Sequence, residues 1–231
     1  MPDDSLRIEV AGENALIVYL GETLSSAVAG RVQRMSQQLS ECLADQLVDL
    51  VPSYASILVI YRSDRIRTDE LRKHIEEFGK AASEPMTTEA GRLVTLPVWY
   101  GAEAGPDLKA LAESNGLTPD EVVQRHHALE YRVYAIGFAP GFAYLGEVDE
   151  AIARPRLATP RKHVPTGSVG IADRQTAVYP AESPGGWNLI GRCPVRIFDP
   201  LTAVPMPMGV GDRIQFEPIS RSEYLELGGT P

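Results

Sequence analysis

The sequence is short of cysteine, of long apolar runs and of positive charge. Two cysteines, Cys42 and Cys193, occur among 231 residues, too few for a disulfide framework and typical of a protein from a reducing compartment. No run of about 18 apolar residues is present, so no membrane-spanning helix is expected. The formal net charge of −9 argues against a general nucleic-acid or anionic-membrane binder. The opening MPDDSLRIEV has acids where a secretory signal needs bases, so we expect a cytoplasmic protein.

Several catalytic motifs are missing as well. The chain has no phosphate loop of the form GxxxxGK followed by Ser or Thr, and no GxGxxG after an expected strand. It has no HExxH or CxxC spacing and no GxSxG elbow. His126 and His127 are adjacent on an expected helix and therefore point to different faces. These absences exclude a self-contained nucleotide site, a metal hydrolase and a serine hydrolase, and we expect no metal ion.

The first ninety residues alternate between strand and helix patterns. Apolar residues recur at three-, four- and seven-residue steps from Val28 to Leu50, which predicts one long helix that begins at Ser25 or Ser26 and ends before Pro52. Helices that alternate with strands predict a small α/β sandwich with the helices on one sheet face. The other elements expected here are strands at 6–11, 14–20 and 55–61, a helix from Thr68, and a possible last strand at 92–100.

The rest of the chain has a different composition. Residues 83–91 are polar and without periodicity, which is typical of a linker. Helices are expected at 106–115 and from Thr118, which would cap its helix with Pro119 at the first helical position and Glu121 completing a capping box. Gly and Pro then make up 16 of the 64 residues from 137 to 200, a pattern of short strands and tight turns. We therefore predict an α+β protein with an N-terminal α/β domain at 1–84 and a C-terminal β-rich domain at 91–231.

A cationic segment stands out against the acidic chain. Residues 151–172 hold four Lys or Arg residues and no Asp or Glu, an arrangement that suits a carboxylate, a phosphate or a developing oxyanion. Arg161 or Lys162 would supply charge, and His163 could act as a hydrogen-bond donor or proton shuttle. The alternatives are a solvated loop, cations paired with acids of the N-terminal domain, and a structural histidine. Arg161, Lys162 and His163 are the candidate catalytic residues.

Two further motifs supply candidate binding residues. GFAPGFAYLG at 137–146 places aromatic rings on a turn-rich loop, which predicts either an apolar wall beside a ligand or a hydrophobic plug between strands. ESPGGWNLIGR at 182–192 has a Gly-Gly pair that permits close backbone approach, or that forms a turn beside a core tryptophan. The candidate substrate-binding residues are Phe138, Phe142, Tyr144, Thr166, Ser168, Glu182, Trp187, Asn188 and Arg192.

Three stretches together resemble one known family. GFAPGFAYLG, TPRKHVPTGSVGIADRQTAVYP and SPGGWNLIGR are similar to motifs of the allophanate hydrolase subunit 1 family, also called the carboxyltransferase C and D subdomain family. The resemblance implies a small N-terminal α/β domain and a C-terminal cyclophilin-like β-barrel whose Gly/Pro-rich turns surround a groove. Thr166 stands where the resemblance leads us to expect alanine or another small residue.

The resemblance implies three functions. The first is the B subunit of an ATP-dependent 5-oxoprolinase, which opens 5-oxoproline to L-glutamate with subunit-A-like and subunit-C-like partners. ATP would act at the level of the complex, because this chain has no phosphate loop, and the chain alone would be inactive. The second is a carboxyltransferase half for a urea-like or other small amide, with biotin on another protein, because no AMKM-like tetrapeptide is present. The third is an inhibitor of a sensor histidine kinase that is similar to KipI. All three predict a hetero-oligomer.

Overall fold

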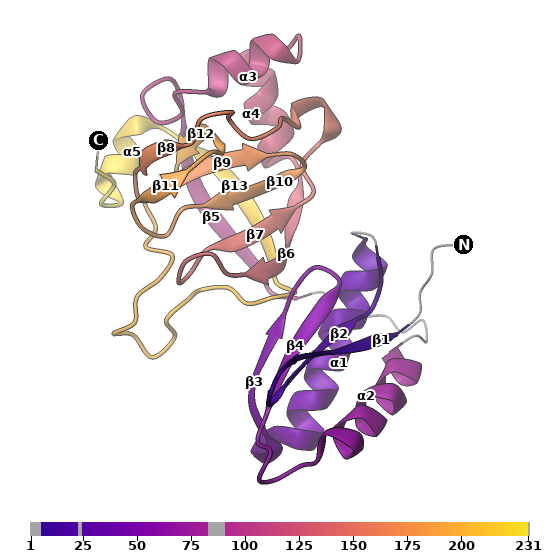
Figure 1. Cartoon of the computed structure of the whole chain (residues 1–231). Coiled ribbons are helices and arrows are strands. Elements are labelled where there is room, and N and C mark those ends of the chain that lie inside the picture. The colour runs from indigo at the N-terminus through magenta and orange to yellow at the C-terminus, as the bar shows by residue number, and fades with distance from the viewer. Residues whose placement is uncertain (1–5, 23–24, 83–90, 231) are drawn as a thin grey trace. The chain divides into compact units, whose positions relative to one another are not determined.

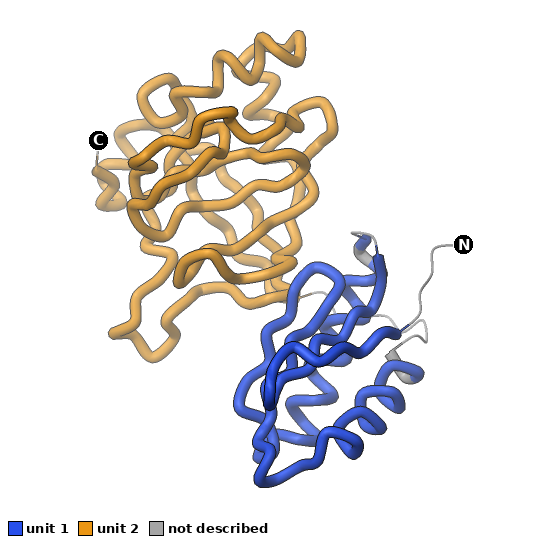
Figure 2. Tube along the Cα trace, in the orientation of Figure 1, with its two compact units in different colours: residues 1–90 blue, residues 91–231 orange. Residues whose placement is uncertain are grey.

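The chain divides into two compact units, residues 1–90 and 91–231 (Figure 2). The computed structural model describes residues 6–22, 25–82 and 91–230. The expected linker at 83–91 lies almost wholly outside these residues. Within the described ranges, every helix is too short or too polar to cross a membrane. Each unit has its own core and is described by itself.

The first unit is an antiparallel sheet with two helices on one face (Figure 1). The strands follow the order β1-β2-β4-β3 across the sheet. Buried side chains of α1, α2 and the inner strands form one apolar core. The elements are β1 (Arg7–Gly12), β2 (Ala15–Tyr19), α1 (Ser26–Leu43), a 3₁₀ turn (Ala44–Gln46), β3 (Leu47–Pro52), β4 (Ser56–Tyr61) and α2 (Thr68–Ala82).

Helix α1 begins where the sequence predicts but ends earlier. The Ser25 hydroxyl caps it by accepting a hydrogen bond from the Val28 N–H at 3.2 Å. The helix stops at Leu43, and residues 47–52 form strand β3, so the prediction of helix as far as Leu50 is wrong. A register shift between Leu47 and Asp49 places Leu47 opposite Tyr61 and Leu50 opposite Val59. Leu47 and Leu50 therefore both pack on the core. Two core-facing residues three positions apart are also what an α-helix would show, so this strand resembles a helix in its apolar spacing.

The second unit is a closed seven-stranded barrel. The strands around it are ordered β10-β7-β6-β13-β5-β12-β9, and buried side chains of these strands and of the two helices between β5 and β6 form the largest apolar core of the unit. The α+β class predicted from the sequence is therefore confirmed. The barrel strands are β5 (Leu93–Tyr100), β6 (Glu130–Ile136), β7 (Ala143–Gly146), β9 (Ser168–Ala172), β10 (Gln175–Val178), β12 (Asn188–Arg192) and β13 (Arg213–Ile219).

Strand β5 closes the barrel. It pairs in parallel with β13, from Leu93 opposite Arg213 to Trp99 opposite Ile219, and its other edge pairs with β12. The possible assignment of residues 92–100 as the last strand of the N-terminal sheet is therefore wrong. The partner strand lies about 120 residues further along the chain, and proximity in sequence gave no indication of it.

Shorter elements cover the outside of the barrel. Helices α3 (Leu108–Ser114) and α4 (Pro119–His127) lie beside each other (Figure 1). The predicted capping box of α4 is confirmed, with Thr118 and Glu121 as its two members. Strands β8 (Arg161–Val164) and β11 (Ser183–Gly185) form a separate two-stranded sheet. The remaining elements are a 3₁₀ turn (Glu150–Ile152) and helix α5 (Arg221–Glu226).

Candidate functional site

A cavity of about 580 Å³ opens in the second unit where the Gly/Pro-rich motifs meet. Its walls come from the loop before β7, the turns on either side of β9 and β10, the segment after β12, and the region from α5 to residue 230. We call it the motif cavity. It is lined by Ala139, Pro140, Thr166, Pro180, Ala181, Cys193, Pro194, Val195, Arg196, Phe198, Pro200, Tyr224, Gly228, Gly229 and Thr230.

The loop from Gly137 to Phe142 forms one rim of the motif cavity. Hydrogen bonds from the Gly137 N–H to the Phe142 carbonyl and from the Phe142 N–H to the Ala139 carbonyl, both 3.0 Å long, close the turn. Gly141 has a φ of +85°, and a Cβ there would lie 2.5 Å from the Cβ of Phe198. Phe138 has a φ of +71° and a side chain that is 65% exposed. Such backbone strain in an exposed residue is typical of functional loops.

A cluster of aromatic rings supports this loop from behind. Phe142 makes edge-to-face contacts with Phe138, Tyr144, Tyr179 and Trp187 at centroid distances of 4.9–5.6 Å. Phe142 and Trp187 are buried, so these two rings pack as a hydrophobic plug, one of the two arrangements that the sequence allowed. Phe138 remains available at the surface.

The motif cavity has few polar side chains. Thr166 is exposed and is the candidate site residue that lines the cavity. Arg196 lines it too; its Nε donates to the Phe198 carbonyl at 3.2 Å and its Nη1 lies 3.1 Å from Asp199 Oδ2. Arg196 was not predicted from the sequence, because it lies outside the acid-free stretch at 151–172. Its position inside the Gly/Pro-rich segment was the one sequence feature that could have indicated it.

The segment after β12 and the region from α5 to residue 230 form the opposite wall of the motif cavity. Arg192 donates from Nη1 to the Thr230 carbonyl at 2.8 Å, and the Tyr224 hydroxyl donates to the same carbonyl at 2.9 Å. Arg192, a candidate binding residue, therefore anchors this wall. Burial raises the pKa of the Cys193 thiol to about 12, so Cys193 stays protonated at neutral pH and is a poor nucleophile.

The three candidate catalytic residues lie apart from the motif cavity. Arg161 Nη2 donates to Asp107 Oδ1 at 2.7 Å, and Asp107 Oδ2 also accepts the Leu189 N–H at 2.7 Å. His163 Nδ1 lies 3.0 Å from Glu182 Oε1, with both side chains exposed. Lys162 is exposed in the same strand, β8. The predicted cationic rim is thus divided between one scaffold ion pair and two surface side chains.

The remaining candidates are part of the barrel wall. Ser168 and Asn188 are buried. The Asn188 amide donates to the Pro155 and Ile171 carbonyls, at 3.0 Å in each case. Asn188 therefore ties strand β12 to strand β9 and to the segment before β8.

Tyr179 links the cationic segment to the aromatic cluster. Burial raises the pKa of its hydroxyl. A hydrogen bond from the backbone N–H of Trp187 and the positive charges of Arg156 and Arg161 act in the opposite direction and lower this pKa. The Arg156 guanidinium also lies 5.9 Å from the centroid of the Trp187 ring system. Tyr179 and Asp107 were not singled out from the sequence, because each of them matters through a contact with a residue that is distant in sequence.

The fold and the motif cavity define a class: a two-unit α+β chain in which the turns of a closed barrel surround a cavity. Residues 6–208 match the family model described as carboxyltransferase domain, subdomain C and D. The chain belongs to this family.

Two curated relatives match over nearly their whole length. The chain is 36% identical to the 5-oxoprolinase B subunit of Bacillus subtilis over 228 residues, which cover 94% of this chain and 95% of the relative. It is 37% identical to the 5-oxoprolinase B subunit of Escherichia coli O157:H7 over 212 residues, with 92% and 95% covered. A weaker match, 28% identical, covers 94% of this chain and 13% of the urea amidolyase of Saccharomyces cerevisiae.

Solved structures agree with these matches. The crystal structure of TTHA0988 is 33% identical with a TM-score of 0.79, and the match covers 89% of this chain and 40% of that chain. The protein PH0987 from Pyrococcus horikoshii is 41% identical with a TM-score of 0.57, and 94% and 100% are covered. The urea amidolyase of Kluyveromyces lactis, at 17% identity and a TM-score of 0.73, shares the fold.

Proposed function

We propose that this chain is the B subunit of an ATP-dependent 5-oxoprolinase that acts in the cytoplasm. The observation that carries the proposal is the match to two 5-oxoprolinase B subunits over 95% of each relative's length. The complex would open the lactam of 5-oxoproline to give L-glutamate at the expense of ATP. Subunit-A-like and subunit-C-like proteins would complete it.

The reaction calls for charge stabilisation. A lactam carbonyl is a weak electrophile, and phosphorylation of its oxygen by ATP would activate it. Positive groups near that oxygen would stabilise the charge that develops during transfer. In the motif cavity, Arg196 would supply positive charge and Thr166 a hydrogen bond. Phe138, which is exposed on the loop that forms one rim, would help to exclude water. Because the sequence has no phosphate loop, ATP would bind to a partner.

The cationic segment has a smaller part in this proposal. Lys162 and His163 are exposed and would be available to a reactant presented by a partner protein. Arg161 is held by Asp107 and would act by positioning strand β8. Substrate contacts by these three residues, and by the other candidate binding residues, remain proposals.

The test is reconstitution. The chain purified alone should show no 5-oxoproline-dependent ATPase activity, and the complex with both partners should release glutamate in step with ADP. Arg196→Gln should lower kcat/KM of the complex by about a hundredfold, the usual cost of losing one charge-stabilising donor. Arg174→Gln, which removes another exposed and ion-paired arginine, should leave kcat/KM unchanged. Lactam-dependent ATPase activity of the chain alone, or a complex that releases no glutamate, contradicts the proposal.

The match to urea amidolyase supports a second candidate, a carboxyltransferase half that works with carboxybiotin. The same cavity would then hold a urea-like amide, and the biotin carrier would be a separate protein. Affinity capture from the source cells distinguishes the two. Recovery of a biotinylated partner favours the carboxyltransferase, and recovery of subunit-A-like and subunit-C-like proteins favours the oxoprolinase.

A further inference from the structure

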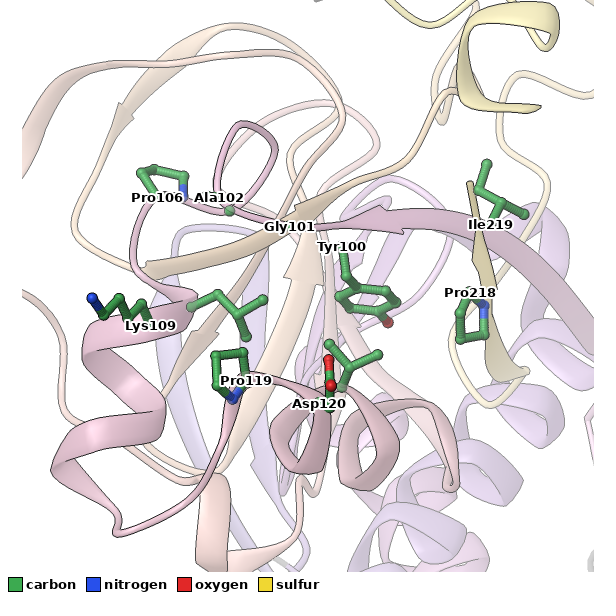
Figure 3. A pocket seen from close by; sticks show the side chains of 12 residues that line it. Tyr100, Gly101, Ala102, Pro106, Lys109, Pro119, Asp120, Pro218 and Ile219 are labelled. Carbon is green, nitrogen blue, oxygen red and sulfur yellow. The ribbon is translucent and has the colours of Figure 1, made fainter. Parts of the chain in front are cut away.

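A second cavity, of about 440 Å³, lies at the carboxyl ends of the parallel strands β5 and β13 (Figure 3). Helices α3 and α4 and the loop after β5 form its other walls. We call it the helix cavity, and neither the proposed function nor the motif cavity involves it. It is lined by Tyr100, Gly101, Ala102, Gly105, Pro106, Leu108, Lys109, Pro119, Asp120, Val123, Pro218 and Ile219.

The loop wall of the helix cavity is held in place by hydrogen bonds. The Gly105 N–H donates to the Gly101 carbonyl at 2.6 Å, and the Asp107 N–H donates to the Leu189 carbonyl at 3.0 Å. A Cβ at Gly105 would lie 2.1 Å from the carbonyl carbon of Ile190, so the loop packs tightly on β12. The cavity wall is therefore formed before any ligand arrives, which is the usual state of small-molecule sites.

A buried chain of hydrogen bonds fixes the aromatic floor. The Thr176 hydroxyl donates to the Gly170 carbonyl at 3.0 Å, so its oxygen accepts from His126 Nε2 at 2.9 Å. Burial lowers the pKa of His126 to about 3, so the neutral ring has a bare Nδ1. This nitrogen accepts the Tyr100 hydroxyl at 2.8 Å. Tyr100 is thus anchored through its hydroxyl, and its ring is held as part of the cavity surface.

The walls of the helix cavity carry one carboxylate and one ammonium group, Asp120 and Lys109, which lie at different places on the wall. Within the described ranges, the Asp120 carboxylate has no hydrogen-bond or ion-pair partner, and it points toward the Tyr100 ring (Figure 3). The Lys109 ammonium is directed away from that ring in the same view and lies 3.8 Å from Glu113 Oε1. The other lining side chains are apolar. An aromatic face and a carboxylate together attract an organic cation.

We infer that the helix cavity binds a small protonated amine with an aromatic or aliphatic body. The ammonium group would lie between the Asp120 carboxylate and the Tyr100 ring, and the apolar body would pack against Leu108, Val123 and Ile219. The proline residues in the walls lack N–H donors, which disfavours an anionic ligand. This inference goes beyond the proposed function and does not depend on it.

The test compares three probes of one size: benzylammonium, benzyl alcohol and phenylacetate, titrated calorimetrically into the full chain at pH 7. Benzylammonium should bind with a Kd on the order of 1 mM. Benzyl alcohol should bind about tenfold more weakly, since it loses both the ion pair and the cation–π contact. Phenylacetate should bind more weakly still. Equal affinity for the three probes, or no saturable binding of benzylammonium, overturns the inference.

Variants locate the binding. Asp120→Asn should weaken benzylammonium binding about fivefold and leave benzyl alcohol binding unchanged. Asp64→Asn, at an exposed position in the first unit, is the matched control and should change neither. Ala102→Trp, at an exposed position on the rim, should block both probes while the thermal unfolding midpoint stays unchanged. Normal binding to the Ala102→Trp variant, or an equal loss in both Asp variants, places the amine elsewhere and contradicts the inference.

Discussion

At the scale of single residues, the Arg161–Asp107 pair shows how a cation can serve the scaffold in a segment that resembles a reaction centre. The side chains are 28% and 15% exposed, and the two groups lie 2.7 Å apart. Asp107 also accepts the Leu189 N–H, so the pair ties β8 to β12 and to the start of α3. The sequence revealed the concentration of positive charge at 151–172. It could not reveal the neutralising partner, which lies 54 positions earlier.

We predict that Arg161→Ala lowers the free energy of unfolding by about 2 kcal/mol, because it leaves a mostly buried carboxylate without its cation. Lys162→Ala, next to it and exposed, should change that free energy by less than about 0.5 kcal/mol. Urea denaturation of the two variants, followed by circular dichroism, measures both values. If Arg161→Ala is as stable as the parent chain while its reconstituted complex is inactive, Arg161 acts in catalysis and the scaffold role is wrong.

At the scale of elements, the helices and strands that the sequence placed one by one all lie before residue 128, and the failures among them have physical causes. The capping box at Thr118 and Glu121 was visible because both members lie within four residues. Strand β3 was taken for the end of a helix because its bulge puts Leu47 and Leu50 on one face. The sequence suggested that β5 could be the last strand of the N-terminal sheet. This suggestion was wrong because its partner β13 is remote in sequence. Local signals predict local structure, and pairing between distant strands leaves no such signal.

Helix α4 supplies the pH-dependent prediction, through His126. The folded-state pKa is about 3 and the ordinary value is 6.5, so between these values the unfolded chain binds a proton that the folded chain does not. The free energy of unfolding should therefore fall by about 1.4 kcal/mol for each pH unit below about 6. Urea titrations from pH 7 to pH 5 should show this slope in the parent chain and in His127→Gln, and a shallower slope in His126→Gln. Equal slopes in the three proteins would refute the assignment.

At the scale of the whole molecule, the second unit contains every strand of its own barrel and two cores of its own. From the sequence, the composition change near residue 91 and the family resemblance led us to expect a separate β-rich domain after this point. The Gly/Pro-rich motifs indicated which turns meet, but not which side chains face the motif cavity between them. Of the candidate residues, Thr166 lines the motif cavity, whereas Arg196 came from the structure.

We predict that residues 91–231, produced alone, fold to the same barrel, because the strand pairings of the barrel all lie within this range. Amide spectra of the fragment should overlay on the corresponding signals of the full chain, and urea should unfold it in one cooperative transition. A fragment of residues 91–212, which lacks β13, is the control and should not give a dispersed spectrum. A poorly dispersed spectrum from residues 91–231 would mean that the first unit is needed for folding.

The parallel pairing of β5 with β13 also has a consequence for synthesis. Strand β5 is among the first parts of the second unit to leave the ribosome, and its partner is among the last. During translation, both edges of β5 therefore stay unpaired until β12 is made, and the edge that faces β13 stays unpaired until residue 219 is added. Unpaired strand edges invite association between chains. Nascent chains of this protein should thus depend on chaperone protection until residue 219 emerges from the exit tunnel.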